Sequence, residues 1–131
     1  PFEHAYPPPQ LRRQFWLNLN GLWEFTITPL NESLPRQFDQ TIRVPYPVES
    51  FLSGLQQRVD EQMFLWYRRS FDPQELPAFD TNSSRLLLHF DKVDFETLVF
   101  INEHPLTPIH RGGYDPFSYD ITPFVLLNQI N

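Results

Sequence analysis

Proline and short apolar runs divide this sequence into pieces that leave little room for long helices. Fourteen of the 131 residues are proline, whereas only four are glycine. No stretch of about ten or more residues repeats apolar side chains at the spacing of a helix. Short runs instead alternate apolar and polar residues, which is the pattern of a strand with one buried face. About seven such runs, separated by proline-rich turns, predict an all-β sandwich.

The clearest strand pattern lies in residues 22–28, where Trp23, Phe25 and Ile27 alternate with polar side chains. An Asn-Gly dipeptide, which is a strong turn signal, comes directly before this run. The three apolar side chains are therefore expected to face the core. Further strands are expected at residues 41–44, 63–71, 86–90, 97–101, 106–109 and 117–121.

The segments between these runs are expected to be irregular. Residues 48–62 are expected to contain one helical turn, and a second helical turn is expected at 122–127. Residues 102–104 predict a tight reversal of the chain. The only double glycine, at 112–113, supplies a position that can adopt positive φ. Aromatic residues that follow, Tyr114 among them, are expected to hold this second reversal in place.

The length of the chain fits one domain, because about 130 residues can bury roughly 65–70% of the surface of the unfolded chain. Residues 1–16 include three consecutive prolines and are expected to form an extended arm. Residues 17–131 are expected to form the β-sandwich.

Composition excludes several classes of function. The formal charge is −6, and no run of Lys and Arg exceeds two residues, so a nucleic-acid partner is not expected. The absence of cysteine excludes disulfides and thiolate metal sites. No apolar run approaches 18 residues, so no membrane partner is expected, and secreted, lysosomal-type and cytoplasmic locations all stay open. No nucleotide-binding or zinc motif is present, and no cofactor is expected.

Five phrases occur in one order and cover about residues 6–127. They are LNLNGLWEF at 17–25, VPYPVESFLSG at 44–54, LWYRRSF at 65–71, LLLHFDKVDFETLVFINEHPL at 86–106 and HRGGYDPFSYDIT at 110–122. Together they resemble the N-terminal sugar-binding domain of glycoside hydrolase family 2, which includes β-galactosidases, β-glucuronidases and β-mannosidases. The resemblance implies a jelly-roll, galactose-binding-like sandwich. Family members continue past the "DIT" phrase into further strands, so the sandwich is expected to be incomplete at its C-terminus.

The resemblance also implies a function for the longer chain. The parent enzyme would be a retaining β-glycosidase that hydrolyses terminal β-linked sugars, with its catalytic glutamates on a separate barrel domain. This segment alone is expected to be non-catalytic, to pack on that barrel and to shape its active site. Residues 49–62 are the expected barrel-facing loop, since loops on a rigid scaffold carry such contacts. The expected partners are the barrel of the same chain, a carbohydrate substrate and, as a further option, a second copy of the protein.

Four residues are candidates for contact with the sugar, namely Tyr46, Glu49, Trp66 and Tyr114. Aromatic rings stack on the apolar face of a pyranose, and a carboxylate accepts hydrogen bonds from hydroxyl groups. Packing in the core is the competing interpretation for each aromatic residue, because an aromatic side chain in a strand mostly packs.

No residue of this chain is expected to be catalytic. A retaining glycosidase needs two carboxyl groups about 5–5.5 Å apart. The nearest by sequence are Asp91, Asp94 and Glu96, which are interpreted as an acidic turn. Asp91 and Asp94 are also the expected carboxylate partners of Arg68 or Arg69, and the weak candidates for a structural calcium site.

Two other classes of function stay open. A stand-alone carbohydrate-binding module or lectin would carry a row of exposed aromatic residues on one sheet face. A structural interaction protein that kept only the fold would present a sheet edge for a strand of another protein.

Overall fold

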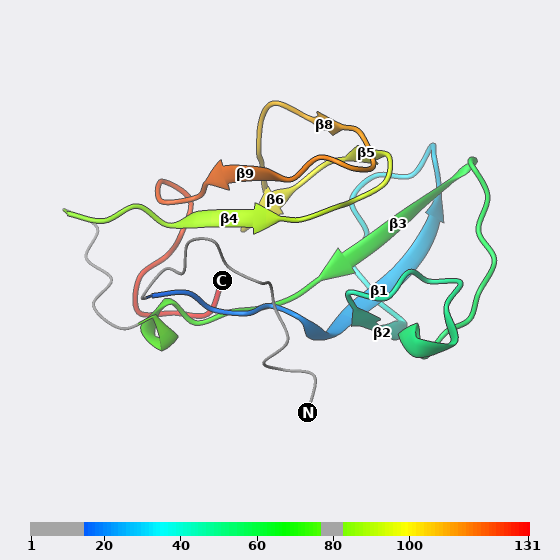
Figure 1. Ribbon diagram of the computed structural model, residues 1–131, viewed down its shortest axis with the longest axis horizontal. Helices are drawn as coiled ribbons and strands as arrows, with labels where there is room; N and C mark the ends of the chain where they lie inside the picture. The colour runs from blue at the N-terminus through cyan, green and yellow to red at the C-terminus, as the bar shows by residue number, and fades with distance from the viewer. Residues whose placement is uncertain (1–14, 77–82) are drawn as a thin grey trace. The chain divides into compact units, whose positions relative to one another are not determined.

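A computed structural model describes residues 15–76 and 83–131, which belong to two compact units. The first unit ends at Arg69 and the second begins at Ser70. The arm expected at residues 1–16 lies almost wholly outside the described residues, so the boundary at residue 17 stays a prediction. The described elements are β-strands and two short 3-10 turns, which confirms the all-β fold class (Figure 1).

The first unit contains one antiparallel sheet of three strands in the order β2-β1-β3. These strands are β1 (Gly21–Pro29), β2 (Gln40–Val44) and β3 (Met63–Arg68). The central strand β1 places Trp23 opposite Ile42 and Phe25 opposite Tyr67. Alternation along β1 therefore brings apolar residues of neighbouring strands onto one face.

Phe25 and Ile42 are fully buried and form the centre of the first core with Val48. Trp23 and Ile27 pack against these residues, as the alternation predicts. The Trp23 indole N–H donates to the Leu19 carbonyl at 2.7 Å, which satisfies its polar group at the edge of the core. Burying a side chain such as Phe25 stabilises the fold by about 1.5–3 kcal/mol.

The second unit contains three short antiparallel strand pairs. These are β4 (Leu87–Phe90) with β9 (Phe117–Asp120), β5 (Glu96–Thr97) with β8 (His110–Arg111), and β6 (Phe100–Ile101) with β7 (His104–Pro105). Its core contains Val99, Ile101, Leu106, Tyr119 and Ile121.

The expected strand at 97–101 is divided in two, because β5 pairs with β8 whereas β6 pairs with β7. The prediction of a strand at residues 106–109 is wrong, because the structure has no strand there. Strand β7 ends at Pro105, Pro108 has no N–H for a ladder, and the Leu106 N–H donates to the Val99 carbonyl.

Two further boundaries differ from the expectation. Strand β3 ends at Arg68, and Phe71 exchanges two backbone hydrogen bonds of 3.0 Å with Asn131. Residues 122–127 form turns rather than a helical turn, and a proline at 123 removes one backbone donor there.

Two local predictions are confirmed. The loop at 48–62 contains the 3-10 turn η1 (Phe51–Ser53). Asn102 and Glu103 have φ of 49° and 68° and connect β6 to β7, which is the two-residue hairpin with both central residues left-handed. A second 3-10 turn, η2 (Pro73–Glu75), is capped by Asp72. Among residues 15–76 and 83–131, no helix is long and apolar enough to cross a membrane.

Candidate functional site

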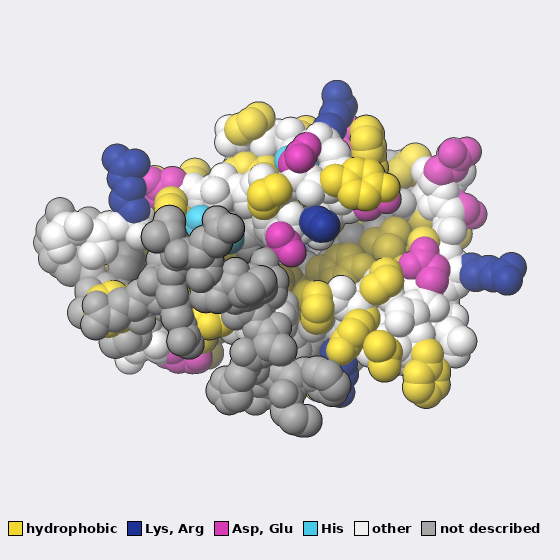
Figure 2. Space-filling view, viewed as in Figure 1, with side chains coloured by type: hydrophobic (Ala, Val, Ile, Leu, Met, Phe, Trp, Pro, Cys, Tyr) yellow, Lys and Arg dark blue, Asp and Glu magenta, His cyan; other side chains and the backbone are white. Residues whose placement is uncertain are grey.

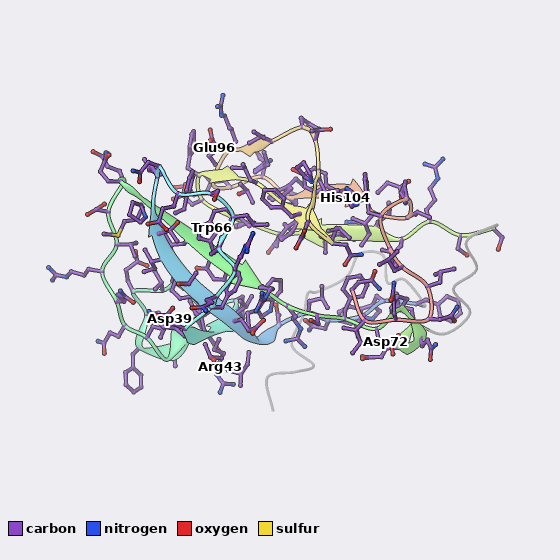
Figure 3. The ribbon with its side chains drawn as sticks, turned by 180° about the vertical axis from the view of Figure 1, so that it is seen from behind. Asp39, Arg43, Trp66, Asp72, Glu96 and His104 are labelled. Carbon is purple, nitrogen blue, oxygen red and sulfur yellow. The ribbon has the colours of Figure 1, made fainter. Side chains whose placement is uncertain are left out.

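Two of the candidate sugar-contacting aromatic residues, Tyr46 and Trp66, lie in the first unit. Trp66 is half-buried on β3, and its indole N–H donates to the Thr28 hydroxyl at 2.8 Å (Figure 3). The ring of Phe64 meets Trp66 edge-on, with centroids 5.7 Å apart. Tyr46 is half-buried after β2, where its N–H donates to the Arg43 carbonyl. The ring contact and the indole hydrogen bond favour the packing interpretation for Trp66, whereas Tyr46 stays a candidate for contact with a sugar.

Glu49 lies in the same loop as Tyr46 and is exposed. Its negative charge acts on Tyr67, whose ring packs edge-on against Phe25 with centroids 5.0 Å apart. Burial of the phenol, with the charge of Glu49 as the smaller cause, raises the pKa of Tyr67 to about 12. The charge of Glu49 therefore helps to keep the Tyr67 phenol protonated.

The loop that contains Glu49 presents two large apolar side chains to solvent. The Ser50 hydroxyl caps the turn η1 by accepting from the Leu52 N–H, and Gly54 ends the turn with φ of 88°. The buried Ser53 hydroxyl donates to backbone carbonyls inside the loop and accepts from its N–H groups. Phe51 is 77% exposed on this hydrogen-bonded turn, and Leu52 is also exposed.

Tyr114 lies in the second unit and is 85% exposed, in the loop between β8 and β9. The prediction that it holds the double-glycine reversal in place is therefore wrong. The reversal is stabilised by the Gly112 N–H, which donates to the Phe95 carbonyl at 2.8 Å, while Gly112 adopts φ of 140°. His110 stacks on Phe117 next to it, with centroids 3.8 Å apart.

A second exposed aromatic side chain, Phe95, lies beside this loop and is missed by the sequence patterns. It is 64% exposed, and its backbone is bonded to Gly112. A Cβ atom on Gly113 would lie 2.7 Å from Oδ1 of Asp94, so the two segments are in close approach. We call residues 94–95 and 112–115 the Tyr114 surface. Phe95 lies in an acidic stretch with no strand alternation, so no sequence signal sets it apart from a packed phenylalanine.

Strands β5 and β8 form the base of the Tyr114 surface. Glu96 lies opposite Arg111, and the Arg111 Nε donates to its carboxylate at 2.6 Å. Figure 2 shows hydrophobic side chains next to acidic and basic ones over the region of β5 and β8. The ion pair joins directly opposite residues of the two short strands from which the loops emerge, and its net contribution is small because both side chains are exposed.

Several acidic residues of the described chain serve as ion-pair partners or turn caps. Arg68 pairs with Glu24, not with Asp91 or Asp94 as expected, and its guanidinium also lies 4.1 Å from the ring centre of Phe38. This happens because Glu24 and Arg68 are direct neighbours across β1 and β3. The other arginine, Arg69, donates to the Leu22 carbonyl at 3.0 Å.

Among the carboxyl groups of the described residues, those of Glu24 and Asp120 have shifted pKa values, and both shifts are downward. The hydrogen bond from Arg68 holds the pKa of Glu24 below its usual value. Hydrogen bonds from Thr122, with Arg85 as a weaker neighbour, lower the pKa of Asp120. A general acid in glycoside hydrolysis requires the opposite direction.

Metal ligands do not gather in the part of the chain that the structure describes. Within residues 15–76 and 83–131, no group of three His, Asp or Glu side chains is placed to hold an ion. Asp91 and Asp94 are both exposed, and a calcium site at these residues stays a prediction.

An antiparallel all-β chain of this length is a domain of the β-sandwich class, which occurs in many enzymes and binding proteins. A scan against protein-family models finds no match. The chain is 26% identical over 113 residues to a β-galactosidase of Thermoanaerobacter pseudethanolicus, in a match that covers 83% of this chain and 14% of that protein.

The fold is also similar to part of a solved β-glucuronidase from Faecalibacterium prausnitzii. That match has a TM-score of 0.63 and 22% identity, and it covers 93% of this chain and 21% of the other. The two comparisons confirm the resemblance to the N-terminal domain of glycoside hydrolase family 2. The chain spans a small part of the length of both glycosidases.

Proposed function

We propose that this chain is a non-catalytic N-terminal domain of a family 2 β-glycosidase. It would pack on a catalytic barrel in the same polypeptide and shape the active site for terminal β-linked sugars. The observation that carries the proposal is the coverage, since 83% of the chain matches 14% of a β-galactosidase and 93% of it matches 21% of a β-glucuronidase. The jelly-roll topology and the retaining mechanism of the parent enzyme are parts of this proposal.

The carboxylates of the chain support a non-catalytic role. Glu24 and Glu96 are each held by an arginine at 2.6 Å, and Asp72 accepts from the backbone of η2. The hydrogen bond from Arg68 stabilises the charged form of Glu24 and so lowers its pKa. The general acid of a retaining glycosidase must instead hold its proton, which requires a raised pKa. These groups therefore act in folding rather than in proton transfer.

The loop at 49–62 is the surface that we assign to contact with the barrel. Phe51 and Leu52 are exposed on a turn that Ser50, Ser53 and Gly54 hold in one conformation. A rigid loop that presents large apolar side chains loses little conformational entropy when it docks. A covering protein surface would remove this apolar area from water and stabilise the contact.

The test is the denatured intact mass of the natural polypeptide that carries this sequence. A mass several times 15.7 kDa agrees with a domain of a larger glycosidase. A natural polypeptide near 15.7 kDa would contradict the proposal, because no barrel would then accompany the domain. In that case the chain would be a stand-alone binding protein, and glycan arrays would test which carbohydrate it binds.

A further inference from the structure

We propose that the guanidinium group of Arg69 binds a carboxylate that another part of the same polypeptide, outside these 131 residues, supplies. The inference rests on the proposed function, because it requires a longer natural chain, and it deepens that function by naming one contact between this domain and the rest of the enzyme. The observation that carries it is a buried donor atom, Nε of Arg69, for which no described residue supplies an acceptor.

Arg69 differs from the other described arginines in how its charge is satisfied. Three of them form ion pairs with carboxylates, namely Arg68, Arg85 and Arg111. Three others are exposed, so water hydrates them, namely Arg36, Arg43 and Arg58. Arg69 is half-buried and forms no ion pair with a described residue. Because a guanidinium stays charged in proteins, this shielded cation requires an anionic partner.

The backbone at the start of β1 holds one side of this guanidinium. Nη1 of Arg69 donates to the Leu22 carbonyl at 3.0 Å, and a Cβ atom on Gly21 would lie only 3.2 Å from the same nitrogen. Gly21 also has φ of 128°, a conformation that favours glycine. The missing side chain at residue 21 therefore lets the guanidinium lie against the strand, and the edge formed by Nε and Nη2 remains for a second partner.

A carboxylate fills the same edge of the neighbouring arginine. Arg68 donates from Nε and Nη2 to the two carboxylate oxygens of Glu24, at 2.6 and 3.0 Å. The corresponding nitrogens of Arg69 have no partner among the described residues. One carboxylate would satisfy both nitrogens and the charge, whereas a neutral acceptor would leave the charge unpaired. Since Arg69 is only half-buried, rotation of its side chain can present this edge at the surface.

The charge of the chain favours a carboxylate of the polypeptide over a free anion. The formal charge is −6, so the field of the chain disfavours anions in solution. A carboxylate in the same polypeptide is present at a high effective concentration and does not have to be recruited. The chain matches 14% of a β-galactosidase and 21% of a β-glucuronidase, so most of the proposed enzyme lies outside this domain.

Carbodiimide cross-linking of the full-length natural protein tests the proposal, because this reagent joins an amine to a carboxylate that contacts it. Arg69→Lys places an amine at residue 69, and peptide mass spectrometry then locates the carboxylate to which it is joined. We expect one dominant cross-link from residue 69 to an Asp or Glu outside the 131 residues. No such cross-link, or one to a carboxylate within the 131 residues, would overturn the proposal.

Two proteins serve as controls for the cross-link. The wild type gives the background, because Lys92 is the only lysine of this chain. Arg43→Lys introduces an amine at an exposed arginine and should give no dominant cross-link.

Thermal melting of the full-length protein then measures the coupling between Arg69 and the acid so identified. Arg69→Met and the amide variant of that acid should each lower the melting temperature, and the double variant should melt no lower than the less stable single variant. Arg43→Met should melt like the wild type. Additive losses would mean that Arg69 acts only through its bond to the Leu22 carbonyl, and they would overturn the proposal.

Hydrolysis of nitrophenyl β-glycosides by the same proteins separates this inference from the proposed function. A full-length protein that hydrolyses these substrates but shows additive losses would refute the Arg69 contact and leave the glycosidase standing. A full-length protein that hydrolyses nothing, yet gives the cross-link to a carboxylate outside the 131 residues, would refute the glycosidase and support the contact.

Discussion

Arg68 donates two hydrogen bonds, of 2.6 and 3.0 Å, to the carboxylate of Glu24, which lies directly opposite it across β1 and β3. The pair is half-exposed, so solvent screens it and its net contribution is small. We expect Glu24→Gln to lower the free energy of unfolding by about 0.5 kcal/mol. A double-mutant cycle with Arg68→Gln measures the coupling, and Glu61→Gln, on an exposed residue outside the described ion pairs, is the control.

The same ion pair should make the free energy of unfolding depend on pH in the acid range. The pKa of Glu24 is lower in the folded chain than in the unfolded one, because Arg68 stabilises the carboxylate. Its stabilisation is present above the unfolded pKa and is lost as the pH falls through the folded pKa. Wild type and Glu24→Gln should therefore become equally stable at the acid end of a urea titration. A constant difference in unfolding free energy across that range would contradict this account.

Tyr67 predicts a loss of stability in alkali. Burial and the charge of Glu49 raise its pKa to about 12, above that of an unfolded tyrosine. As the pH rises above about 10, the unfolded chain releases the phenol proton while the folded chain retains it, so folding becomes less favourable. Because Tyr67 is 40% exposed, we discount the shift to on the order of 1 kcal/mol.

Denaturant unfolding between pH 9 and pH 12 measures this loss, and Tyr67→Phe should flatten it. Absorbance of the tyrosinate gives an independent titration. A wild-type curve as flat as that of Tyr67→Phe would refute the assignment to this residue.

The sequence predicts the features of this structure that depend on neighbouring residues better than those that depend on distant ones. Alternation in β1 correctly placed Trp23, Phe25 and Ile27 on the core face, since side-chain direction is local to a strand. Strand partners are not local, and so the division of 97–101 between β5 and β6 could not be foreseen. The all-β class follows from the number of short alternating runs, and the family resemblance, which depends on the order of phrases over most of the chain, agrees with it.

Exposure of aromatic residues was the least predictable property of the candidate site. Trp66 and Tyr114 both stand in aromatic-rich phrases, yet Trp66 packs beside Thr28 whereas Tyr114 faces solvent. A sequence pattern gives no measure of what covers a loop residue. Phe95 belongs to the Tyr114 surface through the hydrogen bond that its carbonyl accepts from the Gly112 N–H, a contact that no local sequence pattern predicts.

The close approach of Gly113 to Asp94 predicts that substitutions at these two residues have coupled effects on stability. Gly113→Ala places a Cβ atom 2.7 Å from Oδ1 of Asp94, so the carboxylate must move. Because Asp94 is exposed and its carboxylate is free to rotate, we expect a loss of at most about 1 kcal/mol in unfolding free energy. In an Asp94→Ala background the same substitution should cost clearly less. Equal costs in both backgrounds would refute the close approach as the cause.

Substitutions in the loop at 49–62 should separate the stability of the domain from its contact with the barrel. Ser53→Ala removes a buried hydroxyl that donates to carbonyls and accepts from the Leu55 N–H, so unfolding free energy should fall by about 1–3 kcal/mol. Phe51→Ala should leave the isolated chain as stable as wild type, because its ring is exposed. In the full-length protein Phe51→Ala should lower the melting temperature, and no change there would contradict the assigned barrel contact.

The most direct test of the central claim compares the full-length natural protein with the isolated 131-residue chain on a panel of nitrophenyl β-glycosides. The account predicts turnover by the full-length protein and none by the isolated chain, even when circular dichroism shows that the isolated chain is folded. Turnover by the pure 131-residue chain would contradict the claim that this is a non-catalytic domain of a β-glycosidase.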